Sequence, residues 1–314
     1  MLCPTCQIEG RKFGKDRYGN QRFQCLTCRK TFADREARPL GTMRVTIDKA
    51  LSVLQLLLEG MSIRAAMRVT GTNRNTILDL LALMGQRCEK MLETRIKGLP
   101  VQDVQVDEVW GFIFCKEKTR TRAYPDQAEV GDAYCFVGIE RSTKLILAWH
   151  LGRRSTEDTH AFARKLAHAT TGRFQVTTDG FRPYQSVMPA ELKGVDFATL
   201  AKLYATKDEH RYSPGEVTGT VKTICCGNPD PSKICTSHVE RGNLTVRMQD
   251  RRMTRLTNAF SKKWANHHYS MALHFAWFNF GRVHMTLKTT PAVAAGLEER
   301  PWTLRELVKR STLS

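Results

Sequence analysis

The chain has 314 residues, of which 49 are Lys or Arg and 31 are Asp or Glu, so its formal net charge at neutral pH is +18. Hydrophobic residues make up 41% of the chain and charged residues 25%, proportions typical of a folded protein that exclude wholesale disorder. The excess of positive charge predicts an anionic partner, and nucleic acid is the first candidate.

The sequence lacks the features of a membrane or secreted protein. Its longest apolar runs, such as residues 51–58, are too short to span a bilayer. Cys3 and Cys6 stand where the apolar core of a signal peptide would begin. We therefore expect a cytoplasmic protein without membrane contact, whose ten cysteines are metal ligands or free thiols before they are disulfides.

Residues 1–38 contain few aliphatic side chains but two Cys-x-x-Cys pairs, formed by Cys3, Cys6, Cys25 and Cys28. Each pair presents two thiolates from one tight loop, and two such loops make the tetrahedral cage typical of structural Zn²⁺. Residues 17–23 predict a hairpin between the loops, with its turn at Gly19 and Asn20. The prediction is a zinc ribbon in which the metal holds the fold. The alternative is a set of unrelated or redox-active cysteines.

Residues 39–98 predict a helix-turn-helix DNA-binding domain. Helices are expected over residues 46–59, 63–69 and 73–84, with Ser62 as the cap of the second. Polar residues occupy the start of the third helix, where a recognition helix contacts bases and phosphates: Asn73, Arg74, Asn75 and Thr76. The alternative is a plain three-helix bundle that does not contact DNA.

Residues 99–288 alternate short apolar runs with helical patterns, which is typical of an α/β domain. The predicted strands cover residues 104–114, 133–140, 144–150 and 174–180, and the predicted helices cover residues 156–169, 237–247 and 264–281. Asp107 lies inside the first strand, where a carboxylate is costly unless it binds a metal or a partner. Asp179 lies at the carboxyl end of the last strand, where open α/β sheets bind ligands.

A third carboxylate, Glu240, lies on the predicted helix that begins at residue 237. Together with Asp107 and Asp179 it could bind a pair of Mg²⁺ ions, the arrangement that supports two-metal chemistry at phosphorus. Asn243 and Arg247 share the helical face of Glu240, and Arg247 would face the phosphate backbone. The alternative is that all three acids are ordinary surface carboxylates.

Residues 241–288 are strongly basic, with Asp250 as their single acid. Because so many positive charges repel one another without an anion, we expect Arg251 and Arg252 to contact DNA phosphates. The aromatic side chains of residues 264–281 are expected to fill a core.

Residues 208–236 read as a loop without an assigned role. Their cysteines, Cys225, Cys226 and Cys235, are expected to be free thiols. The alternative is a second metal site, with a fourth ligand such as His210 or His238.

Taken together, these segments resemble a bacterial transposase of the insertion-sequence-1 family. The matching residues are the two cysteine pairs, the helix-turn-helix, and residues 106–110, 178–184, 238–247 and 279–287. The resemblance covers nearly the whole chain, and the His-Val-Glu-Arg-x-Asn-Leu-Thr stretch from His238 is highly specific. One departure is that the DNA-binding and catalytic halves form one chain here, whereas the family often encodes them in two reading frames.

The resemblance implies an RNase H-like catalytic domain with a DDE triad at Asp107, Asp179 and Glu240. It also implies catalytic Mg²⁺, cleavage of double-stranded DNA at the terminal inverted repeats of an insertion sequence, and strand transfer into a target. The enzyme would be nucleoid-associated and would act as a homo-oligomer, because two element ends must be held together.

The sequence therefore predicts a multidomain protein: a zinc ribbon (1–38), a helix-turn-helix domain (39–98), an RNase H-like α/β domain with a helical basic extension (99–288), and a tail (289–314) ending in a short helix. The predicted function is DNA transposition. The alternatives are a DNA-binding regulator with an inactive RNase H-like domain and, third, an unrelated metal-dependent nuclease or resolvase. Intact carboxylates at all three positions favour an enzyme over a regulator.

Overall fold

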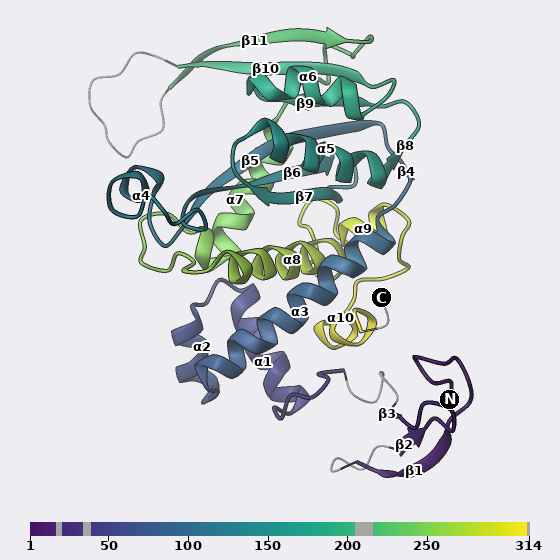
Figure 1. The fold of residues 1–314 in the computed structure, drawn as a ribbon. Helices are drawn as coiled ribbons and strands as arrows, with labels where there is room; N and C mark the ends of the chain where they lie inside the picture. The colour runs from purple at the N-terminus through teal and green to yellow at the C-terminus, as the bar shows by residue number, and fades with distance from the viewer. Residues whose placement is uncertain (17–20, 34–38, 205–215, 313–314) are drawn as a thin grey trace.

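The computed structural model describes residues 1–16, 21–33, 39–204 and 216–312. A mixed sheet with helices on both faces forms the upper part of Figure 1, and a group of helices lies beneath it. A small sheet near the N-terminus lies to one side. No helix in the described ranges is both long and apolar enough to cross a bilayer.

The small sheet contains three antiparallel strands, β1 (Arg11–Lys15), β2 (Gln21–Gln24) and β3 (Thr31–Ala33). The pairing of β1 with β2 confirms the predicted hairpin, while its predicted turn at Gly19 and Asn20 lies outside the described residues. The rings of Phe23 and Phe32 stack with centroids 5.9 Å apart. So small an apolar contact is far short of a core, as expected where a metal holds the fold.

Three helices follow, α1 (Ile47–Leu58), α2 (Ile63–Thr70) and α3 (Arg74–Arg95). The side chains of Thr46, Ser62 and Asn73 cap them by accepting hydrogen bonds from backbone N–H groups of the first turns, which fixes the three starting points. Gly71, with φ at +61°, provides the left-handed residue that ends α2.

The third helix is longer than predicted, because its apolar stripe continues past residue 84 through Cys88 and Met91. This second half packs along α8 (Trp264–Phe280), and the two helices share one hydrophobic core with the large sheet. Gly85 permits the close approach, since a Cβ there would lie 2.4 Å from the Cβ of Tyr269. The helices of the predicted DNA-binding domain are thus packed directly against the α/β body.

The large sheet has six strands in the order β11-β10-β9-β5-β6-β7. Their bounds are β5 (Asp103–Ile113), β6 (Gly131–Glu140), β7 (Ile146–Gly152), β9 (Gln175–Thr178), β10 (Asp196–Tyr204) and β11 (Val217–Cys226). An antiparallel meander, β5-β6-β7, is followed by β9 and β10, which run parallel to β5. Two further strands of two residues each, β4 (Leu99–Pro100) and β8 (Thr170–Thr171), pair with each other in a separate small sheet.

Helices cover both faces of this sheet. On one face lie α5 (Thr156–Ala169), whose bounds equal the predicted ones, and α6 (Arg182–Glu191). On the other lie α7 (Ser237–Gln249) and α8. The remaining helices are α4 (Glu117–Ala123), a 3₁₀ turn (Arg251–Met253), α9 (Pro291–Ala294) and α10 (Leu304–Arg310). The aromatic side chains of α8 fill the core as predicted, with Phe275, Phe278 and Phe280 buried.

One prediction about the fold is wrong. Residues 217–226, expected to belong to a loop, form β11, which pairs antiparallel with β10 at the edge of the sheet. Most of its side chains are exposed, so the strand lacks the apolar alternation that reveals a half-buried strand. Its β-branched Val, Thr and Ile residues were the available signal. Residues 208–215 of the predicted loop lie outside the described residues.

Candidate functional site

Three carboxylates converge where β5 and β9 run side by side. Asp107 and Glu108 lie in the middle of β5, and Asp179 follows the last residue of β9, whose Thr178 pairs with Val106. Oxygens of the three carboxylates all lie within 4.8 Å of one another. The structure therefore brings Asp107 and Asp179 together as the sequence suggested.

Glu108 is the member of this cluster that sequence reasoning missed. Strand alternation directs its side chain to the face opposite that of Asp107, toward α6, and the sequence pattern predicts no metal-binding role for it. Its side chain is only 3% exposed, and its Oε1 atom has no hydrogen-bond partner among the described residues. A buried acid next to an acid in a central strand was the signal that could have marked it.

The third predicted ligand, Glu240 of α7, has a different partner. The ammonium group of Lys202, on β10, contacts both Glu240 oxygens, with Nζ to Oε1 at 2.5 Å. The hydroxyl of Thr236 donates to Oε1 at 2.6 Å. Glu240 thus lies outside the group of three converging carboxylates, and its role as a metal ligand stays a prediction.

The helix α7 is fastened to β5 by polar contacts. Gln105 accepts hydrogen bonds from the N–H groups of His238 and Val239 at the start of the helix. Farther along, Asn243 Nδ2 donates to Asp107 Oδ2 at 2.8 Å, while Asn243 Oδ1 is buried without a partner in the described structure. Asn243 therefore fixes one oxygen of Asp107.

Arg247 was expected to face a DNA phosphate, and the structure gives it a different position. Its Nη2 donates to the carbonyl of Trp110 at 3.1 Å and its Nη1 to the carbonyl of Met253 at 3.2 Å. The guanidinium therefore ties α7 to β5 and to the 3₁₀ turn.

Crowding and burial raise the pKa of two carboxyl groups in the cluster. Burial, together with the nearby Asp179 carboxylate, raises the pKa of Asp107 to about 6 and that of Glu108 to about 8. The Asn243 amide opposes the shift at Asp107, and the Tyr184 hydroxyl and Arg154 oppose it at Glu108. Like charges packed this closely are stabilised by a cation.

Arg154 brings positive charge to this cluster. Its Nη2 lies 3.5 Å from Asp179 Oδ2 and 3.7 Å from Glu108 Oε2. The guanidinium carbon lies 4.3 Å from the centroid of the Phe181 ring, a cation–π contact that orients it. Its side chain is 40% exposed, so the same group faces both the acids and solvent.

The cluster fits a hard divalent cation. Carboxylate oxygens are ligands that Mg²⁺ prefers, and the buried Oε1 of Glu108 is an atom that such an ion would satisfy. Asp107, Asp179 and Glu108 are the residues placed to hold it.

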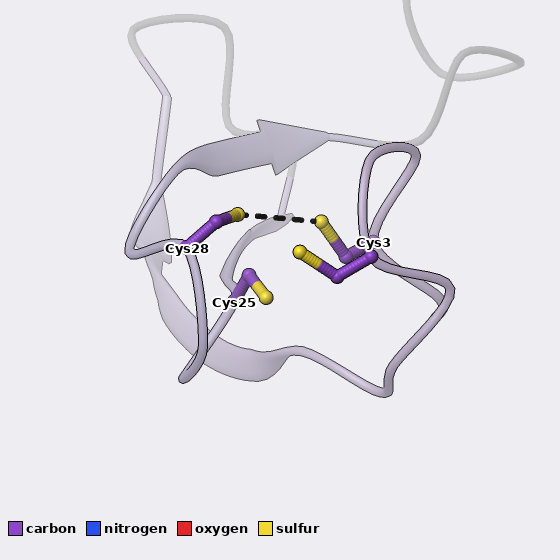
Figure 2. Close-up of side chains that lie close together, drawn as sticks. Cys3, Cys25 and Cys28 are labelled. Atoms are coloured by element: carbon purple, nitrogen blue, oxygen red, sulfur yellow. Dashed lines mark hydrogen bonds between the residues drawn. The ribbon is translucent and has the colours of Figure 1, made fainter.

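The four N-terminal cysteines form a second candidate metal site. The four sulfur atoms, of Cys3, Cys6, Cys25 and Cys28, all lie within 4.8 Å of one another. Those of Cys3 and Cys28 are 3.7 Å apart (Figure 2). The backbone N–H of Cys28 lowers the pKa of Cys25 to about 6, which favours its thiolate, the form that binds metal. This geometry confirms the predicted clustering and fits tetrahedral Zn²⁺.

Three further cysteines lie on or after β11. Within the described ranges, Cys225, Cys226 and Cys235 form no disulfide and belong to no group of potential metal ligands, and their state as free thiols stays a prediction. His210, one fourth ligand considered for them, lies outside the described residues.

The predicted recognition residues lie at the start of α3. Asn73, Arg74 and Asn75 are exposed and Thr76 is half-buried. Asn73 also caps the helix, its Oδ1 accepting from the N–H of Asn75 at 2.9 Å. Arg74 and Asn75 are thus accessible to a partner, as the prediction of a recognition helix requires.

The two arginines of the 3₁₀ turn differ from each other. Arg251 is half-exposed, as a phosphate contact requires. Arg252 is turned inward: Nη1 donates to the hydroxyl of Ser261 at 3.3 Å, and Nη2 is buried without a partner among the described residues. Burial lowers the pKa of its guanidinium. These contacts orient Arg252 toward Ser261, and its role as a phosphate contact stays a prediction.

The substitution Arg74→Ala is expected to cost about 1–3 kcal/mol of binding to a cognate element end and to relax sequence preference. Arg251→Ala should weaken binding to every duplex equally and flatten the slope of log K against log salt by about 0.9. Binding isotherms on cognate and scrambled duplexes at several salt concentrations check both. Arg164→Ala, in a surface arginine of α5, is the control. Equal loss on both duplexes for Arg74→Ala would make the helix-turn-helix a purely electrostatic anchor.

The free energy of unfolding of the chelator-treated protein is expected to fall between about pH 5 and pH 8. The folded protein holds the Glu108 proton up to a pKa of about 8, whereas the ordinary value is 4.5, so this stabilisation is complete at low pH and disappears as pH rises. Thermal unfolding of the wild type and of Glu108→Gln across this range measures the difference. Glu299→Gln, in an exposed acid, is the control. Parallel pH curves for wild type and Glu108→Gln would contradict the assignment.

Comparison with protein-family models and with curated proteins finds no match to this chain.

Proposed function

We propose that this protein is a transposase that binds the terminal inverted repeats of an insertion sequence and cleaves and joins DNA with the help of Mg²⁺. The order of the large sheet supports an RNase H-like catalytic domain. An antiparallel meander leads into two strands parallel to its first strand, β5, which lies at the centre. Asp107 occupies that central strand, and Asp179 directly follows the strand beside it.

The observation that carries the proposal is the convergence of Asp107 and Asp179, 72 positions apart in the chain, on one point of this sheet. The helix that bears Glu240 packs against the same strand, and its Asn243 contacts Asp107 directly. Carboxylates assembled from two strands, with a third on an adjoining helix, are the donor set that phosphoryl-transfer sites with two metal ions require.

Each residue of the site then has a defined task. Asp107 and Asp179 would hold the metal ions, and Glu240 would complete the ligand set if its ion pair with Lys202 opened. Asn243 keeps Asp107 oriented through its amide hydrogen bond. Bound Mg²⁺ supplies Lewis-acid activation of water and of the scissile phosphate. Arg154 is positioned to compensate negative charge beside the cluster.

DNA binding is assigned to separate elements. The net charge of +18 attracts the phosphate backbone, and the exposed start of α3 offers Arg74 and Asn75 to base edges. The cysteine cluster holds a basic N-terminal ribbon that adds a second DNA contact. Because two element ends must be joined, the active form is a homo-oligomer on DNA.

A DNA-joining assay distinguishes a transposase from an unrelated nuclease. Purified protein is incubated with Mg²⁺, a duplex ending in the element's terminal repeat with a free 3′-OH, and a supercoiled target plasmid. A transposase covalently joins the 3′-OH to the plasmid. Hydrolysis of the duplex without any joined product would identify a nuclease instead.

A further inference from the structure

Two cationic side chains of the chain itself are bound to the acidic residues of the candidate active site. Lys202 Nζ contacts both oxygens of Glu240. Arg154 Nη2 lies between Asp179 Oδ2, at 3.5 Å, and Glu108 Oε2, at 3.7 Å. Three of the four acids at this site thus face a protein cation.

Both cations are anchored outside the cluster and can reach solvent. Lys202 extends from β10, one strand beyond the strand that ends at Asp179, and its side chain is 28% exposed. Arg154 lies between β7 and α5, is 40% exposed, and rests on the ring of Phe181. An ammonium or guanidinium with one side in water can turn from a carboxylate to a phosphate with little change in the backbone.

A divalent ion and these side chains compete for the same oxygens. Glu240 cannot offer both oxygens to a metal while Lys202 holds them, and Arg154 adds positive charge that repels an ion near Asp179. Without any cation, however, the crowded carboxylates would repel one another. The side chains and the metal are therefore alternative counter-ions for one acidic site.

We propose that Lys202 and Arg154 are placeholder cations, which neutralise the carboxylates until divalent metal binds and then turn to phosphates of the bound DNA strand. The inference rests on the proposed function for its DNA step. It makes metal binding and DNA binding cooperative, because the metal frees the two cations that the phosphates require.

The metal step is tested without DNA, by titrating chelator-treated protein with Mn²⁺ in a calorimeter. Lys202→Met and Arg154→Met should each bind Mn²⁺ about two- to tenfold more tightly than wild type, because an ion pair that metal must displace is gone. Lys202→Arg keeps the competing charge and should bind as wild type does. Lys193→Met and Arg164→Met, in exposed residues away from the cluster, are the matched controls. Unchanged or weaker Mn²⁺ binding in both placeholder variants would overturn the proposal. That result is expected if the ion pairs of Lys202 and Arg154 only hold the carboxylates in place.

The DNA step is tested with Ca²⁺, using duplex binding as the readout. Lys202→Met and Arg154→Met should weaken DNA binding in Ca²⁺ and reduce the salt slope by about 0.9 each, yet leave binding in chelator unchanged. Equal losses of DNA affinity with and without Ca²⁺ would overturn the proposal that metal binding turns the two cations from carboxylates to phosphates. If wild type fails to join DNA while the variants bind Mn²⁺ more tightly, the transposase function fails and the placeholder role in metal binding stands. If wild type joins DNA but the variants do not bind Mn²⁺ more tightly, the transposase function stands and the placeholder role fails.

Discussion

Asp107→Asn and Asp179→Asn are expected to lower the rate of Mg²⁺-dependent DNA cleavage by at least about 10²-fold, as the loss of groups that organise transition-state charge does. Both residues lie in the carboxylate cluster, so either change removes a ligand oxygen from the metal site. Glu240→Gln should have the same effect, since it removes the third carboxylate. Single-turnover cleavage of a labelled end duplex gives the rates.

Binding of the element end provides the control for these variants. The predicted recognition residues lie at the start of α3, far along the chain from the cluster, so the three substitutions should leave end affinity nearly unchanged. Asp126→Asn, in an exposed acid of the β5–β6 connection, should cleave as wild type does. A normal rate for Glu240→Gln would show that Glu240 is not a metal ligand.

Loss of one ligand is expected to unfold the N-terminal ribbon. Purified wild type should contain one Zn²⁺ per chain, and Cys3→Ser or Cys25→Ser should release it, because metal binding supplies about 10–16 kcal/mol to so small a unit. The apolar contact between Phe23 and Phe32 is too small to replace that contribution. Elemental analysis and limited proteolysis of residues 1–38 measure the two effects.

Cys225→Ser is the matched control, since this half-buried cysteine belongs to neither described metal group. It should keep both the zinc and the protease resistance. Freshly purified wild type without zinc, or a Cys3→Ser variant that retains it, would refute the structural role of the metal.

The elements that could be predicted from the sequence are those that local chemistry determines. Ser62 accepts from the N–H of Ala65 as a cap should, and α2 starts where predicted. The two cysteine pairs converge as predicted, because paired Cys-x-x-Cys loops at this spacing are typical of a metal site. Asp107 likewise lies inside the strand predicted for residues 104–114, which the structure forms as β5.

What the sequence could not reveal depends on contacts between distant segments. Lys202 meets Glu240 only because β10 and α7 are neighbours in the fold, which no local pattern encodes. The extension of α3 follows from its packing on α8, nearly 200 residues later. The hydrogen bond from Arg252 to the hydroxyl of Ser261 is another such contact, because a count of charges does not give the direction of a side chain.

Cleavage of its own element end tests the central claim most directly. A labelled duplex spanning the junction between terminal repeat and flanking DNA is incubated with the purified protein and Mg²⁺, and the products are sized at single-nucleotide resolution. The predicted result is a nick at the junction that leaves a 3′-OH on the element strand and disappears when Mg²⁺ is chelated. Tight, specific binding of that duplex with no nick in either Mg²⁺ or Mn²⁺ would contradict it, and would identify a DNA-binding regulator instead.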